Sequence, residues 1–128
     1  ITTEPGYISP VINLGIISIN QAKFLEAKKY FETAVGLDQT HLVALNYLGF
    51  IAREAGEFDQ AEAYYRQILD LDPNELNALR NLGILLDLYR GRLEEALVLY
   101  EQYQSLLTEP DPKIKDWIFD TKNRLKAN

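Results

Sequence analysis

The chain has 128 residues, of which 47% are hydrophobic and 25% charged, so its length and composition are those of one ordinary globular domain. Its net charge of −6 argues against nucleic-acid binding, and the lack of cysteine excludes disulfides, thiolate zinc sites and cysteine nucleophiles. The single histidine excludes a His-rich metal site, and no apolar run approaches the roughly 18 residues that a membrane-spanning helix needs.

An internal repeat is the dominant feature of the sequence. Three Leu-Gly pairs, at 14–15, 48–49 and 82–83, follow one another at intervals of 34 residues. Alanine, aromatic and Leu-Asp positions keep the same interval through the first two units, whereas in the third unit the matching alanine arrives one residue late, at Ala96. We expect a one-residue insertion in the turn at 90–92 to account for the delay.

The repeat register divides the chain into segments. Pro5 falls at the end of a preceding unit, so we expect residues 1–7 to be the end of a truncated repeat or an extended lead-in, and the intact protein to continue N-terminally. The units 8–41, 42–75 and 76–110 each contain two stretches with apolar residues spaced three and four apart, which predicts two helices in each unit.

The second unit shows how such a helix pair forms. Gly56 predicts the turn between the two helices, and Gly49 has no side chain, so the partner helix can approach closely. Tyr65 is expected to fill the space between one unit and the next. The run Asp72-Pro73-Asn74 is expected to stop the second helix and to supply an N-cap for the third unit.

Residues 111–128 depart from the repeat and predict a C-terminal capping helix. Asp111 is the expected N-cap, and Pro112 suits the first helical position. One face holds the apolar set Ile114, Trp117, Ile118, Thr121 and Leu125. The remaining faces hold the basic set Lys113, Lys115, Lys122, Arg124 and Lys126, which we interpret as a solvated surface, with an anionic partner as the alternative.

The repeated residues resemble the tetratricopeptide repeat (TPR) family. Leu-Gly at places 7 and 8, a small residue at 20 and an aromatic residue at 24 recur in all three units, and residues 42–75 add Asp-Pro near places 31 and 32. The resemblance implies an all-α, right-handed α-solenoid of three TPR helix-turn-helix repeats plus the capping helix. The stretch from Asn81 to Ile118 is also similar to the ends of some bacterial cell-envelope TPR proteins, which leaves bacterial cytoplasm and periplasm both open.

No catalytic, metal or cofactor constellation appears in the sequence. His41 lies at the junction of two units without a Ser, Cys or acid at a motif spacing, so we interpret it as a surface residue. Most carboxylates fall on outward helix positions, and Asp70-Leu71-Asp72 lacks the remaining ligands of a calcium loop. We therefore expect no enzyme activity and no cofactor.

Binding is the function that the resemblance implies. In TPR proteins the first helix of each unit lines a concave groove. Carried over by position, the expected peptide-binding groove consists of Ile12, Asn13, Ile16, Asn46, Tyr47, Phe50, Arg53, Asn77, Arg80, Asn81 and Ile84. Ile16, Phe50 and Ile84 occupy the same place in successive units and predict an apolar stripe. The alternative is that these side chains pack against each other or under another segment.

Chaperone-binding TPR domains offer a direct comparison. The family pattern holds a terminal carboxylate with Lys, Asn, Asn, Lys and Arg at five places, which here hold Ile12, Ile16, Tyr47, Asn77 and Asn81. This basic set is absent, so a chaperone tail is not the expected ligand. We expect a protein-interaction module or scaffold that binds a peptide segment or partner helix, with no nucleic acid and no membrane span. A self-associating structural solenoid and an accessory module of an enzyme are the alternatives.

Overall fold

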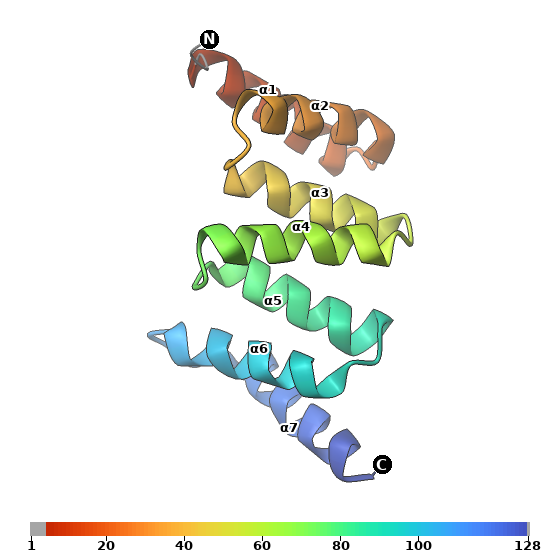
Figure 1. Ribbon diagram of the computed structural model, residues 1–128, viewed down its shortest axis with the longest axis vertical. Coiled ribbons are helices and arrows are strands. Elements are labelled where there is room, and N and C mark those ends of the chain that lie inside the picture. Colours follow the sequence, from red (N-terminus) through yellow and green to blue (C-terminus); the bar gives the residue numbers. More distant parts are fainter. Residues whose placement is uncertain (1–4, 128) are drawn as a thin grey trace. The chain divides into compact units, whose positions relative to one another are not determined.

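The computed structural model describes residues 5–127, with side chains from residue 8 onward. These residues form helices and turns, with no strand among them (Figure 1). The elements are α1 (Pro5–Asn20), α2 (Phe24–Leu37), α3 (Leu42–Glu54), α4 (Phe58–Leu71), α5 (Leu76–Ile84), the π-helical turn η1 (Leu85–Tyr89), α6 (Leu93–Leu106) and α7 (Pro112–Ala127). No helix in this part of the chain is long and apolar enough to cross a membrane.

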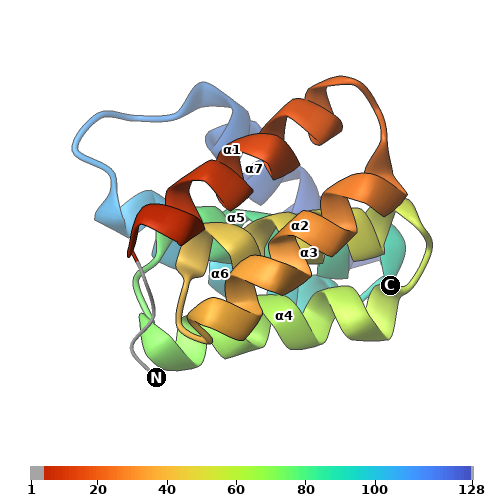
Figure 2. The ribbon, with the colours of Figure 1, turned by 90° about the horizontal axis from the view of Figure 1, so that it is seen from above.

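Two of the helices begin at the first residue of an expected repeat unit. α3 and α5 begin at Leu42 and Leu76, where the second and third units were predicted to start. α1 begins at Pro5, a residue type that suits the first helical position, so residues 5–7 belong to this helix. Residues 1–4 of the predicted truncated repeat lie outside the described residues. α1 and α2 pack side by side in unit 1 (Figure 2).

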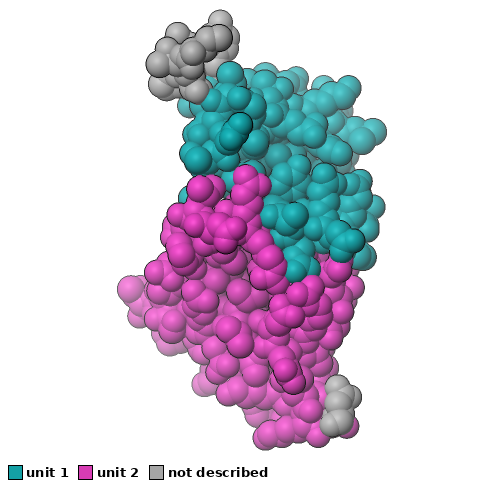
Figure 3. All heavy atoms as spheres, in the orientation of Figure 1, with its two compact units in different colours: residues 1–64 teal, residues 65–128 magenta. Residues whose placement is uncertain are grey.

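Two compact units divide the chain, residues 1–64 and 65–128 (Figure 3). The boundary falls inside α4 and therefore does not coincide with a repeat boundary. Each unit contains its own buried apolar residues.

The core of unit 1 depends on one close approach. Phe31 is fully buried, and a Cβ added at Gly15 would lie only 2.7 Å from its ring. The same ring stacks on Tyr47, with centroids 4.6 Å apart. Glycine of the first Leu-Gly pair is therefore required by the aromatic residue of the same repeat, and that ring in turn contacts the next repeat.

Unit 2 repeats this arrangement. A Cβ added at Gly83 would lie 2.6 Å from the buried ring of Tyr100. Trp117 of α7 lies against the same ring, at a centroid distance of 5.8 Å. The predicted apolar face of the capping helix is confirmed, because Ile114, Ile118 and Thr121 are buried while Trp117 and Leu125 are half-buried.

Left-handed residues form the turns within the three repeats. Gly56 and Gly91 have φ of 78° and 66°, values that favour glycine. Ala22, at the corresponding place of the first repeat, has φ of 58°, a conformation that costs an L-residue roughly 1–2 kcal/mol. The turn of the first repeat is therefore strained at Ala22, whereas the turns of the other two repeats have glycine at this place.

The N-caps differ from the expectation for α5. The backbone N–H of Ala78 donates to the Glu75 carboxylate at 2.6 Å, so Glu75 is the cap rather than the run Asp72-Pro73-Asn74. That run does end α4, and the Asp72 carboxylate accepts from the backbone N–H of Asn74. His41, at the matching place of the preceding repeat, caps α3 by accepting from the N–H of Ala44 at 3.2 Å. The predicted cap of α7 is confirmed, since Asp111 accepts from the N–H of Lys113.

The one-residue insertion in the third repeat lies earlier than predicted. We expected it in the turn at 90–92, but the helix widens into a π-helical turn at Leu85–Tyr89, closed by a bond from the N–H of Arg90 to the carbonyl of Leu85. Hydrogen bonds to the fifth preceding residue place one more residue in a turn than the α-helix does. The extra residue is accommodated there, and Gly91 keeps its turn conformation.

Candidate protein-interaction surface

The first helix of unit 1 places its three predicted groove residues differently. Ile12 is only 8% exposed and belongs to the core cluster of unit 1, so the structure places it in the interior rather than on a binding surface. Asn13 is exposed. Ile16 is half-buried and packs against the core cluster, which leaves only part of its side chain accessible.

The predicted residues of α3 form a set of ring contacts. Tyr47 is half-buried because its ring stacks on Phe31. The rings of Phe50 and Phe24 form a T-shaped pair, with centroids 6.1 Å apart. The Arg53 guanidinium lies over the Phe50 ring, 5.2 Å from its centroid, which is the geometry of a cation–π contact. Asn46 donates from Nδ2 to the carbonyl of Leu42, one turn back. These side chains contribute both to packing and to surface.

In unit 2 the predicted residues lie on α5. Asn77 is exposed, whereas Arg80, Asn81 and Ile84 are half-buried. The Arg80 guanidinium lies 5.3 Å from the ring centroid of Trp117, so the predicted groove residue of the repeat and the capping helix share one surface.

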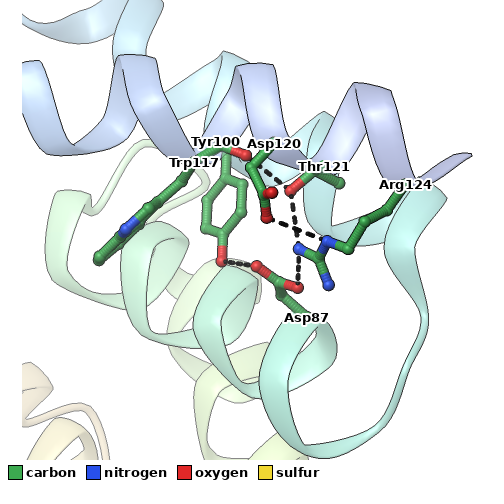
Figure 4. A network of polar contacts seen from close by, with 6 residues as sticks. All are labelled: Asp87, Tyr100, Trp117, Asp120, Thr121 and Arg124. Atoms are coloured by element: carbon green, nitrogen blue, oxygen red, sulfur yellow. Dashed lines mark hydrogen bonds and ion pairs between the residues drawn. The ribbon is translucent and has the colours of Figure 1, made fainter.

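A buried polar network joins η1, α6 and α7 (Figure 4). The Asp87 carboxylate is 8% exposed and accepts two bonds, from the Tyr100 hydroxyl at 2.8 Å and from Nη2 of Arg124 at 2.5 Å. Arg124 also pairs through Nε with Asp120 at 3.0 Å. Burial, with the bond to Asp87 as the next cause, raises the pKa of the Tyr100 hydroxyl well above its ordinary value. The bond to Asp87 likewise raises the pKa of Arg124.

This network corrects the prediction for Arg124. We expected its side chain on the solvated outer surface of the capping helix, but it is half-buried and bonded to Asp87. The spacing along the helix could have indicated this position. Arg124 follows Thr121 of the buried face by three residues and so lies on the same side of the helix. Asp87 faces inward from the π-helical turn, the element that the repeat pattern could not locate.

A hollow of about 410 Å³ opens beside the network in unit 2. It is lined by Ile84, Asp87, Leu88, Tyr100, Trp117, Asp120 and Arg124. Of these residues, Ile84 belongs to the predicted peptide-binding groove. The part of the chain that the structure describes holds no group of three or more side chains able to hold a metal ion.

Comparisons with known proteins agree with this architecture. A tetratricopeptide repeat profile matches residues 40–109, more than half of the chain, and a second one matches residues 11–41. No curated protein sequence matches the chain. Among solved structures, the first TPR of Spaghetti (RPAP3) bound to HSP90 peptide SRMEEVD has a TM-score of 0.89 at 17% identity, with 98% of both chains covered.

Two further solved structures show the same likeness. The first TPR domain of human RPAP3 has a TM-score of 0.85 at 18% identity, with 97% of this chain and 96% of that chain covered. The Sgt2 TPR domain from Aspergillus fumigatus has a TM-score of 0.84 at 14% identity, with 98% of this chain and 82% of that chain covered. The predicted all-α TPR fold is thereby confirmed. The chain belongs to the tetratricopeptide repeat family.

Proposed function

We propose that this chain is a protein-interaction module, without a catalytic role, that binds a peptide segment or partner helix along the first helices of its repeats. The observation that carries the proposal is the recurrence of one kind of residue at one repeat place. Ile16, Phe50 and Ile84 are each half-buried, so each keeps some apolar surface accessible on the first helix of its repeat. A partner segment lying along these helices would cover the accessible apolar part of each of these side chains.

The polar residues of the same helices complement this apolar surface. Asn13 and Asn77 are exposed, and their amides can both donate to and accept from the backbone of a bound segment. The related RPAP3 domain was solved with a bound HSP90 peptide, which is consistent with a peptide ligand for this chain as well.

The partner that we propose is not the peptide SRMEEVD bound by that relative. Among the five places that would hold the basic set, Ile12 is a core residue and Tyr47 stacks on Phe31. A lysine at the place of Ile12 would have to leave the core of unit 1, so the surface is not built for a terminal carboxylate. We expect the peptide SRMEEVD to bind no more tightly than a scrambled peptide of the same composition.

Selection from a displayed library of random peptides tests the proposal. The dissociation constants of selected, labelled peptides are measured by fluorescence anisotropy for the parent chain, Asn13→Arg and Asn77→Arg. Asn123→Arg, an exposed asparagine of α7, is the matched control. We expect a loss of about tenfold or more for the first two variants and less than about twofold for the control. Equal affinities in all four chains would refute the groove.

Self-association is the competing proposal for the same apolar surface. Sedimentation velocity across a concentration series separates the two, because a mass that rises with concentration supports a homo-oligomer. A constant monomer mass supports a surface that is free for a separate partner.

A further inference from the structure

A second hollow lies in unit 1, among side chains that the groove does not use. It has a volume of about 290 Å³, at the lower end of ligand pockets, so it suits one or two side chains rather than a cofactor. The buried part of its lining, here called the floor, consists of Leu48, Ile51 and Ala52 of α3, and Phe24 of α2 and Tyr64 of α4 also line it. None of the predicted groove residues lines it.

Leu25 gives this hollow an apolar rim. It follows Phe24 at the start of α2, lines the hollow, and is 81% exposed. A leucine that is 81% exposed gains little from folding, whereas a partner that covers both Leu25 and the floor would remove the apolar surface of both from water. The hollow therefore has the anatomy of a small anchor site, with a packed floor and an accessible rim.

The charges around the hollow favour a basic partner. Glu54 and Glu57 line it, against Lys28 as the cation of its lining, and the Glu54 carboxylate also accepts from Nη2 of Arg53 at 3.1 Å. Burial first, and then the carboxylates of Glu32 and Glu57, raise the pKa of the Tyr64 hydroxyl, which lines the same hollow. A positive charge beside an apolar anchor would thus meet a mouth in which carboxylates predominate.

We propose that the hollow between α2, α3 and α4 binds a partner protein segment that presents a large apolar side chain flanked by lysine or arginine. The apolar side chain enters the hollow over Leu48, Ile51 and Ala52, and the basic flank lies near Glu54 and Glu57. This is a second interaction surface, independent of the groove on the first helices, so the module can hold two segments at once.

Peptides of defined design test the proposal by solution NMR on the whole chain. The probe carries one central Leu, Phe or Trp with Lys one helical turn to either side. One control peptide replaces Lys by Glu, and another replaces the apolar residue by Ala. We expect the probe to shift the amide signals of Leu25, Ala52, Ala55 and Tyr64, and both controls to leave them unchanged. Equal shifts with the acidic peptide, or no shift with any probe, would overturn the proposal.

Two variants sharpen the result. Leu25→Asp changes an exposed side chain in the first turn of α2, where an acid is compatible with the helix dipole, so the fold should be retained. Glu57→Lys reverses a charge at the mouth. We expect each variant to weaken probe binding by about tenfold or more, and Val98→Asp, an exposed aliphatic residue of α6, to weaken it by less than about twofold.

The same spectra distinguish this proposal from the groove. Shifts confined to Asn13, Tyr47 and Phe50, with affinity unchanged in Leu25→Asp, would support the groove and refute the second site. Shifts at Leu25 and Tyr64 that disappear in Leu25→Asp would support the second site, whatever the library selection shows for the groove.

Discussion

Replacement of Asp87 by alanine should release the capping helix from the third repeat. The carboxylate accepts from the hydroxyl of Tyr100, which is 1% exposed, and from Arg124 of α7. Removing it leaves the buried hydroxyl without this acceptor, which costs about 1–3 kcal/mol. The Arg124 side chain is 38% exposed and keeps its ion pair with Asp120, so the loss of the pair with Asp87 should add only about 1 kcal/mol to the destabilisation. We expect Asp87→Ala to lower the free energy of unfolding by about 2–4 kcal/mol.

Trp117 is the single tryptophan of the chain and lies on α7 against Tyr100, so its fluorescence reports this region alone. Urea unfolding is followed by that fluorescence and, in parallel, by circular dichroism of all helices. In Asp87→Ala we expect the fluorescence transition to move to lower urea than the transition in circular dichroism, since repeat proteins can lose terminal elements first.

A double-mutant cycle isolates the ion pair. Asp87→Ala, Arg124→Ala and the double variant should show a coupling energy of about 0.5–2 kcal/mol, because the two side chains are in direct contact. Asp116→Ala, an exposed acid on the same helix, is the control and should lie within about 0.5 kcal/mol of the parent. The reasoning is refuted if Asp87→Ala behaves like Asp116→Ala, or if the coupling is zero.

Three further predictions concern glycines and pH. Gly15→Ala should destabilise by about 1–2 kcal/mol in urea unfolding because its Cβ meets a buried ring, whereas Gly36→Ala, with open space around it, should stabilise by about 0.5–1 kcal/mol. In thermal unfolding, Ala22→Gly should raise the free energy of unfolding by about 0.5–1 kcal/mol and Gly56→Ala should lower it by about 1 kcal/mol. A change in the same direction for both variants would contradict the left-handed conformation of these two turn residues. Because the pKa of Tyr100 is raised in the folded chain, its neutral hydroxyl contributes stability that is fully present below about pH 10. Above that pH the free energy of unfolding should fall by up to ~1.4 kcal/mol per pH unit, as the tyrosine of the unfolded chain ionises. In Tyr100→Phe, urea unfolding at a series of alkaline pH values should show a smaller fall.

The repeat register could be predicted from sequence because it reflects hard steric constraints. A Cβ at Gly15 or Gly83 would overlap the ring of Phe31 or Tyr100, so small and aromatic residues must recur at fixed places. The helix boundaries follow from the same pattern and from turn residues such as Gly56, which is left-handed as expected. A constraint of this kind appears in the sequence as identity at a fixed interval.

The departures from the prediction lie where the repeat is locally broken. The pattern showed that the third repeat had one additional residue, but any turn could have held it, and the choice of Leu85–Tyr89 depends on packing that spacing does not describe. The inward position of Asp87 follows from that choice. Ile12 was assigned to the groove by its place in the repeat, yet it is buried, because a repeat place fixes the helix position and not the depth of packing.

The aromatic residues of α3 show why surface and core cannot be separated by position alone. Tyr47 stacks on Phe31, and Phe50 contacts Phe24, so both rings stabilise unit 1 while part of each side chain stays accessible. Replacing both by alanine would remove binding surface and core packing together, and a lost partner would then have two explanations. Exposed Asn13 and Asn77 lack this ambiguity. If the groove binds through its asparagines, replacing them will lower its affinity for the bound segment and leave the stability of the chain unchanged.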